Sequence, residues 1–139
     1  QKTAYEILPS LVGSEMCIRD SPSAIEEYCK KNKISFRNPE ILDTKEELKI
    51  FKELSANLIV VVAYGKIIPK NFLKIPKFGF INIHASLLPR WRGATPIEHA
   101  LLAGDKKTGI SIIKISPELD AGDIIIQESL ITFCNRLLL

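Results

Sequence analysis

Residues 58–63 constrain the fold of this chain more than any other part of the sequence. All six residues are apolar, and three consecutive valines supply the β-branched side chains that favour strands. A strand that is apolar at every position is typical of a sheet covered on both faces, as parallel sheets usually are. The sequence therefore predicts an α/β fold with one covered strand at residues 58–63.

Helix-start signals alternate with short apolar segments along the rest of the chain. Capping boxes, in which a hydroxyl residue precedes a glutamate by three positions, begin at Ser23, Thr44 and Thr95. Further strands are expected at residues 34–36, 79–84, 110–115 and 123–127. Strands that alternate with helices indicate an α/β fold with a largely parallel sheet, with room for an antiparallel edge.

The composition excludes several classes of protein. With 46% hydrophobic and 25% charged residues, the 139-residue chain can form one domain with a core. A net charge of +3 is too small to indicate nucleic-acid binding by itself. No apolar run approaches the roughly 18 residues of a membrane span. The three cysteines, Cys17, Cys29 and Cys134, match neither a zinc motif nor a disulfide framework, so we expect a reducing, cytoplasmic compartment.

The two ends of the chain depart from this order. Residues 1–20 lack the apolar first strand that an α/β sheet needs, and residues 9–21 resemble a translated sequencing-adapter peptide. We expect residues 1–20 to be non-native or unstructured. Residues 21–130 are expected to form a partial domain, and residues 131–139 a truncated tail.

Two polar side chains interrupt the apolar strand expected at residues 79–84. Asn82 and His84 are two positions apart, so they point to the same face, about 6.5–7 Å apart along the strand. Such groups are costly to bury unless they are paired. His84 could act as a general acid or base, and Asn82 could donate to a developing oxyanion. The alternatives are a histidine satisfied by backbone groups and an amide that caps loop backbone.

Three further features carry less specific signals. Asp120 lies between two expected strands, where it could orient an imidazole or simply form a turn. With Glu118 and Asp123 it matches no metal-binding loop. Residues 90–92, with sequence Arg-Trp-Arg, could bind an anionic or nucleic-acid partner through a stacked base, or could form a solvated loop with one aromatic anchor.

Three segments, residues 59–69, 82–97 and 119–123, together resemble the formyltransferases that use 10-formyltetrahydrofolate. The similarity extends over about residues 21–127. It implies a Rossmann-like formyltransferase fold with a mostly parallel sheet, incomplete here because the first strands are missing. It also implies that residues 21–130 are part of a catalytic domain.

The resemblance implies a role for each candidate residue. Asn82 would stabilise the oxyanion that forms when an amine attacks the formyl carbon, His84 would take part in the proton transfers, and Asp120 would position and polarise His84. Folate-binding residues are implied at Ser86, Leu87, Leu88 and Pro89, and near the pterin at Tyr64, Gly65 and Ile67.

The resemblance also implies substrates and partners. The formyl donor would be 10-formyltetrahydrofolate without a metal, and the acceptor would be the amine of methionine on initiator tRNA, for translation initiation. We expect a monomer that does not bind membranes, in the cytoplasm of a bacterium or in an organelle of bacterial descent. The alternatives are a formyltransferase for a sugar-nucleotide amine, a hydrolase that releases formate, and an inactive folate-binding fragment.

Glycinamide-ribotide formylation is less favoured, because that branch lacks the Arg-x-Arg-Gly-Ala-x-Pro run found at residues 90–96. The missing first strands and the missing tRNA-binding domain lead us to expect that this chain by itself is inactive and only marginally stable.

Overall fold

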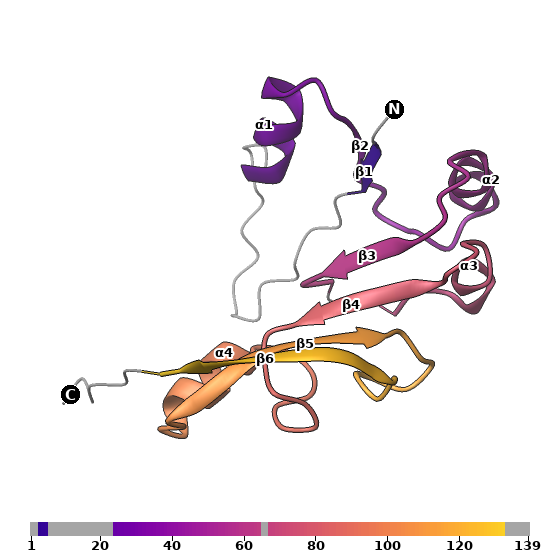
Figure 1. The fold of residues 1–139 in the computed structure, drawn as a ribbon. Coiled ribbons are helices and arrows are strands. Elements are labelled where there is room, and N and C mark those ends of the chain that lie inside the picture. The colour runs from indigo at the N-terminus through magenta and orange to yellow at the C-terminus, as the bar shows by residue number, and fades with distance from the viewer. Residues whose placement is uncertain (1–2, 6–23, 65–66, 133–139) are drawn as a thin grey trace. The chain divides into compact units, whose positions relative to one another are not determined.

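The computed structural model describes residues 3–5, 24–64 and 67–132 (Figure 1). Its elements, in chain order, are β1 (Thr3–Tyr5), α1 (Ala24–Lys31), β2 (Ser35–Arg37), α2 (Lys45–Glu53), β3 (Ile59–Val62), α3 (Lys70–Leu73), β4 (Phe80–His84), α4 (Pro96–Leu102), β5 (Lys107–Lys114) and β6 (Ile124–Ile131). The chain divides into two compact units, which are described separately. The first comprises Gln1–Ser55 and Tyr64–Phe72, and the second comprises Ala56–Ala63 and Leu73–Leu139.

The second unit is built on a sheet with the strand order β3-β4-β5-β6. Strands β3 and β4 are parallel, with Val61 opposite Asn82, whereas β5 and β6 are each antiparallel to the strand before them. The α/β class is confirmed, but the antiparallel part is wider than the single edge that we expected. For β5 and β6 the reason is the short connection of residues 115–123, because short loops join antiparallel strands and parallel strands need a longer crossover.

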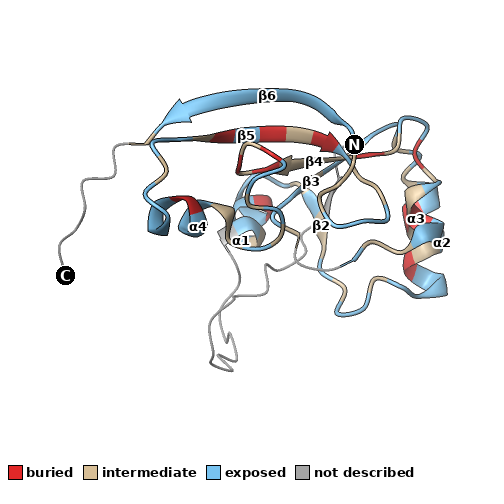
Figure 2. Ribbon diagram, turned by 90° about the horizontal axis from the view of Figure 1, so that it is seen from below, coloured by how far each residue is buried: buried red, intermediate tan, exposed pale blue. Residues whose placement is uncertain are grey.

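Burial differs strongly between the strands of this sheet. Figure 2 shows buried positions along β5, at Gly109, Ser111 and Ile113, whereas β6 is exposed along its length. On β3, Val60 and Val62 are 53% and 61% exposed, while Ile59 and Val61 are better covered. The prediction that this strand is covered on both faces is therefore wrong for the described residues. An unbroken apolar run does not distinguish one covered face from two.

In the first unit, the short strand β1 pairs in parallel with β2, and Ala4 lies opposite Phe36. We expected no strand in residues 1–20, so this part of the prediction is wrong. Strand pairing is made by backbone groups and does not require the apolar pattern on which the expectation relied. Residues 6–23, including the first capping box at Ser23, lie outside the described residues, and the origin of residues 1–20 stays a prediction.

Helix α2 begins as its sequence predicts. The Thr44 hydroxyl accepts a hydrogen bond from the Glu47 N–H at 3.1 Å. The buried Glu47 carboxylate in turn accepts from Nε and Nη2 of Arg37 on β2. Farther along the helix, the Phe51 ring packs edge-on against Phe72 of α3, with centroids 5.1 Å apart. The cap, the ion pair and the aromatic pair therefore hold this unit together.

Helix α4 begins differently from α2. Thr95 has a left-handed backbone, with φ +53°, and its hydroxyl makes no capping hydrogen bond. The capping box predicted at Thr95 is therefore wrong. A capping side chain acts from an extended backbone, and the left-handed conformation does not direct the hydroxyl at the first N–H groups. Among the described residues, no helix is long and apolar enough to cross a membrane.

The two threonines allow a paired test of this difference. We expect Thr44→Ala to lower the free energy of unfolding by about 1 kcal/mol, because an N–H group of the first turn loses its acceptor. Thr95→Ala should change it by less than about 0.5 kcal/mol. Urea titration of both variants measures the two effects, and equal losses would contradict the assignment.

Candidate active site

Strand β4 and the loop between β5 and β6 bring three polar side chains together in the second unit. Asn82 Nδ2 donates a hydrogen bond to Asp120 Oδ1 at 3.2 Å, and Asp120 Oδ2 lies 3.6 Å from His84 Nδ1. The side chains of His84 and Asp120 are only 7% and 11% exposed. The sequence placed Asn82 and His84 on one face of the strand, and the structure brings Asp120, which the resemblance had implied as their partner, into contact with both.

Backbone groups of the loop after β4 complete this cluster. The Gly93 N–H donates to Asp120 Oδ2 at 2.9 Å, and the Trp91 carbonyl lies 2.8 Å from His84 Nε2. Because a carbonyl oxygen can only accept, His84 must carry a proton on Nε2. In the neutral imidazole, Nδ1 is then the unprotonated nitrogen, and it faces Asp120.

Two of the residues that carry these contacts have an unusual backbone. Trp91 has φ +59° and Asp120 has φ +45°, in the left-handed region that residues with a side chain rarely occupy. Such conformations cost about 1–3 kcal/mol each and persist where surrounding contacts hold them. Hydrogen bonds to His84, Asn82 and Gly93 are such contacts here. Unusual backbone thus coincides with the polar cluster.

Residues 86–89, the segment predicted to bind folate, are held in place by hydrogen bonds to two buried serine hydroxyls. Ser86 is fully buried, and its hydroxyl donates to the Arg90 carbonyl at 2.6 Å. The buried Ser111 hydroxyl of β5 donates to the Ser86 carbonyl at 2.6 Å and accepts from the Leu88 N–H at 3.0 Å. Gln127 of β6 donates to this hydroxyl and to the Leu88 carbonyl. The network fixes the loop backbone.

The four side chains of this segment are therefore not equivalent. Ser86 and Leu88 are buried within the chain, whereas Leu87 is partly exposed and Pro89 is exposed. Among the four, Leu87 and Pro89 have the side chains with exposed surface, and the role of all four in folate binding stays a prediction.

The residues predicted to lie near the pterin belong to the first unit. Burial raises the pKa of the Tyr64 phenol above its usual value, and Ile67 is 88% exposed. Gly65 lies outside the described residues. Their role in folate binding stays a prediction.

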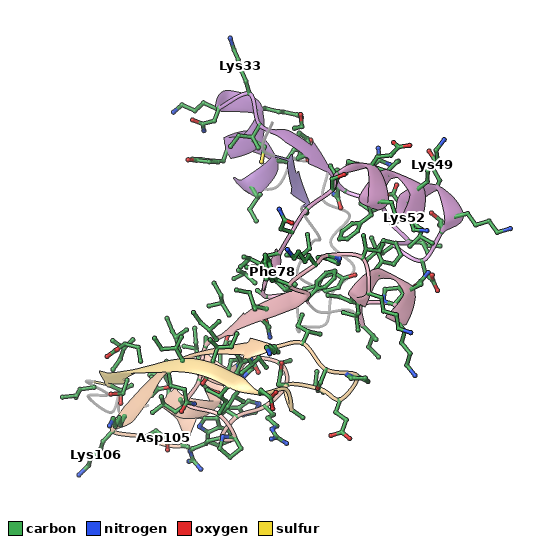
Figure 3. All side chains as sticks on the ribbon, turned by 45° about the vertical axis from the view of Figure 1, so that its right-hand side comes forward. Lys33, Lys49, Lys52, Phe78, Asp105 and Lys106 are labelled. Carbon is green, nitrogen blue, oxygen red and sulfur yellow. The ribbon has the colours of Figure 1, made fainter. Side chains whose placement is uncertain are left out.

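The Arg-Trp-Arg loop is anchored through Asp105, in the turn between α4 and β5 (Figure 3). Its carboxylate accepts two hydrogen bonds from Arg90, at 2.8 and 2.7 Å, and one from Trp91 Nε1 at 2.7 Å. The Trp91 ring stacks on His99, with centroids 5.3 Å apart, and lies 4.3 Å from the Arg90 guanidinium. These contacts favour the alternative in which Trp91 is an aromatic anchor.

The same hydrogen bonds change the acidity of Asp105. Those from Arg90 and then Trp91 lower the pKa of its carboxyl to about 2. Because the folded-state pKa is depressed, the pair stabilises the fold above the ordinary value of about 3.9. That contribution is lost as the pH falls toward about 2. The anchor therefore persists at neutral and mildly acidic pH.

Several residues of the site were not predicted. Ser111 and Gln127 had a signal, because Ser111 lies between isoleucines and Gln127 directly follows three of them. The Trp91 carbonyl and the Gly93 N–H had none, since every residue carries such groups. No cluster of three or more His, Cys, Asp or Glu side chains suited to a metal occurs in the described part of the chain.

The sequence of this chain is similar to that of known formyl transferases. The sequence pattern of the formyl transferase family matches residues 15–135. The chain belongs to this family. It is 50% identical over 106 residues to a methionyl-tRNA formyltransferase of Fusobacterium nucleatum, a match covering 76% of this chain and 34% of the relative. It is 44% identical over 128 residues to one of Ehrlichia ruminantium (strain Gardel), covering 92% and 42%. The chain thus spans about a third to two fifths of these relatives.

Solved structures share the fold. A phosphoribosylglycinamide formyltransferase from Streptococcus pneumoniae matches with a TM-score of 0.73 at 23% identity, covering 84% of this chain and 68% of that one. The Bacillus halodurans protein of the same description matches with 0.68 at 30% identity, covering 81% and 62%. The predicted Rossmann-like formyltransferase fold is therefore confirmed. At the sequence level, the methionyl-tRNA formyltransferases reach higher identity than these structures.

Proposed function

We propose that this chain carries the site for transfer of a formyl group from 10-formyltetrahydrofolate to the amine of methionine on initiator tRNA. The observation that carries the proposal is the Asn82–His84–Asp120 cluster, in which the Asp120 carboxylate accepts a hydrogen bond from the Asn82 amide and lies 3.6 Å from the His84 imidazole. The 40–50% identity to methionyl-tRNA formyltransferases supports this acceptor. In this role the protein would act in translation initiation, in the cytoplasm, as a monomer.

The geometry suits each step of such a transfer. As the amine attacks, a nitrogen–carbon bond forms and the formyl oxygen becomes an oxyanion. Asn82 Nδ2 uses one N–H on Asp120, and its second N–H can donate to that oxyanion. The amine loses a proton to His84 Nδ1, where the adjacent Asp120 carboxylate stabilises it. The proton then passes to N10 of the folate as the old carbon–nitrogen bond breaks, and tetrahydrofolate leaves.

We assign the folate to the surface formed by Leu87 and Pro89, above the backbone held by Ser86 and Ser111. A rigid loop suits this task, because a preorganised site loses little entropy when the ligand binds. A pterin-binding role for Tyr64, Gly65 and Ile67 rests on the resemblance of the sequence alone.

A single-turnover assay tests the function even where multiple turnover is weak. The chain is held in excess over methionyl-tRNA with 10-formyltetrahydrofolate, and formylmethionyl-tRNA is separated and counted. Although we expect no robust turnover from this chain by itself, we expect slow product formation in a single turnover, and it should fall by about 100- to 10,000-fold in His84→Gln. Equal formation by the parent and His84→Gln would contradict the proposal. Sugar-nucleotide amines, or water with formate detection, replace the acceptor in parallel reactions to test the alternatives.

A further inference from the structure

We propose that Asp105 is a positioning residue that acts on His84 through the backbone of Trp91. Asp105 does not touch His84 itself. It clamps the two residues whose peptide segment presents the Trp91 carbonyl to His84 Nε2, and this carbonyl selects the tautomer of the imidazole. The inference rests on the proposed role of His84 in proton transfer.

The clamp is formed by a single carboxylate. Asp105 Oδ1 accepts from Arg90 Nη2, and Oδ2 accepts from both Arg90 Nε and Trp91 Nε1, all at 2.7–2.8 Å. Charge-assisted hydrogen bonds with this two-pronged geometry are the stronger kind, and they fix direction as well as distance. Arg90 and Trp91 are thereby fixed relative to each other.

The turn that carries Asp105 is itself held in place. Its N–H donates to the Ala100 carbonyl of α4 at 3.0 Å, and its carbonyl accepts from the Thr132 hydroxyl. Thr132 also donates its N–H to the Lys106 carbonyl at 3.1 Å. Both backbone polar groups of Asp105 are therefore hydrogen-bonded, and this fixes the position of its carboxylate. A positioning residue needs such a fixed backbone.

The link from the clamp to His84 is the strained peptide of Trp91. Trp91 has φ +59°, a backbone conformation that is energetically unfavourable for a residue with a large side chain. In this conformation its carbonyl oxygen lies 2.8 Å from His84 Nε2. The indole is in contact with the Arg90 guanidinium and is stacked on the His99 ring. Without the carboxylate, we expect the peptide to relax and its carbonyl to leave Nε2.

The consequence for the chemistry concerns the position of one proton. With Nε2 protonated and bonded to Trp91, Nδ1 is free to accept a proton beside Asp120. If the carbonyl moves away, the proton of the neutral ring can shift to Nδ1, where it would face the carboxylate. His84 would then present a donor where the proposed transfer needs an acceptor.

The test measures the tautomer directly. The chain has only two histidines, so the ring nitrogens of His84 and His99 can be resolved by nitrogen-15 NMR at mildly alkaline pH and assigned with His99→Gln. We expect a single tautomer with Nε2 protonated in the parent. In Asp105→Asn, the His84 nitrogens should move toward the average of the two tautomers, and the single-turnover rate should fall by up to about 100-fold.

Three further variants distinguish a specific effect of Asp105 on His84 from a general loss of structure. Glu98→Gln removes one negative charge beside His99, from an exposed side chain on α4, and should leave the His84 tautomer unchanged. Trp91→Phe keeps an aromatic ring but deletes the Nε1–H donor, so it should shift the tautomer in the same direction as Asp105→Asn. Asp105→Glu, which keeps the carboxylate, should restore part of the parent signal.

Two results would overturn the inference. One is an unchanged His84 tautomer in folded Asp105→Asn, and the other, if that variant does not fold, is an unchanged tautomer in Trp91→Phe. The NMR measurement does not depend on formyl transfer. Failure of the proposed function would appear as an absent transfer signal together with an intact tautomer response.

Discussion

Asp120→Asn is expected to lower the single-turnover rate of formyl transfer by about 100- to 10,000-fold. The carboxylate accepts from Asn82 Nδ2 through one oxygen and from the Gly93 N–H through the other. An asparagine in its place has one acceptor oxygen and one donor amide, so one of these partners would face another donor. The negative charge 3.6 Å from His84 Nδ1 would also be lost.

The measurement combines the rate with two controls. Calorimetry with a folate analogue shows whether donor binding survives, and denaturant titration shows whether the variant is folded. Glu118→Gln neutralises an exposed carboxylate in the same loop and should leave the rate close to that of the parent. A folded Asp120→Asn variant with the parent rate would remove Asp120 from the site.

The second large effect is expected from Gly122→Ala, because the loop that carries Asp120 passes directly over the end of β5. A Cβ atom on Gly122 would lie 1.7 Å from the Lys114 carbonyl oxygen and 2.8 Å from its carbon. Both are backbone atoms, so the loop itself must move. The shift would break the hydrogen bond from the Lys114 N–H to the Asp123 carbonyl and displace Asp120 from its partners.

We expect Gly122→Ala to lower the free energy of unfolding by about 1–3 kcal/mol, as overpacking does. We also expect it to reduce the transfer rate about as strongly as Asp120→Asn. Denaturant titration and the single-turnover assay measure the two effects. Ala121→Gly is the matched control, since it loosens the same loop without adding an atom and should cost at most about 1 kcal/mol. Unchanged stability and rate in Gly122→Ala would show that the loop is not confined in this way.

Local patterns in the sequence were sufficient for the fold class and for two of the three side chains of the site. The alternation of side chains along a strand placed Asn82 and His84 on one face, and the capping signal at Thr44 predicted the start of α2. Both properties depend on neighbours a few residues away. The same signal failed at Thr95, because a cap depends on backbone conformation as well as on residue type.

For His84, both sequence-based alternatives contain part of the answer. One ring nitrogen is satisfied by a backbone carbonyl, as in a structural histidine, while the other faces the Asp120 carboxylate. The residue type permits either arrangement. Which nitrogen takes which role depends on the Trp91 peptide, and no residue pattern encodes that orientation.

The sequence by itself determined the α/β class, the paired polar residues of β4 and the resemblance to formyltransferases, because each depends on local periodicity or residue identity. The resemblance implied that Asp120 acts on His84, but only the tertiary structure decided by which contacts Asp120 joins Asn82 and His84. It also decided that Ser86 is buried and that Asp105 anchors Arg90 and Trp91. These contacts join residues far apart in the chain, and several of them use backbone groups that all residues share. Their partners are therefore fixed by the packing of the loops on the sheet.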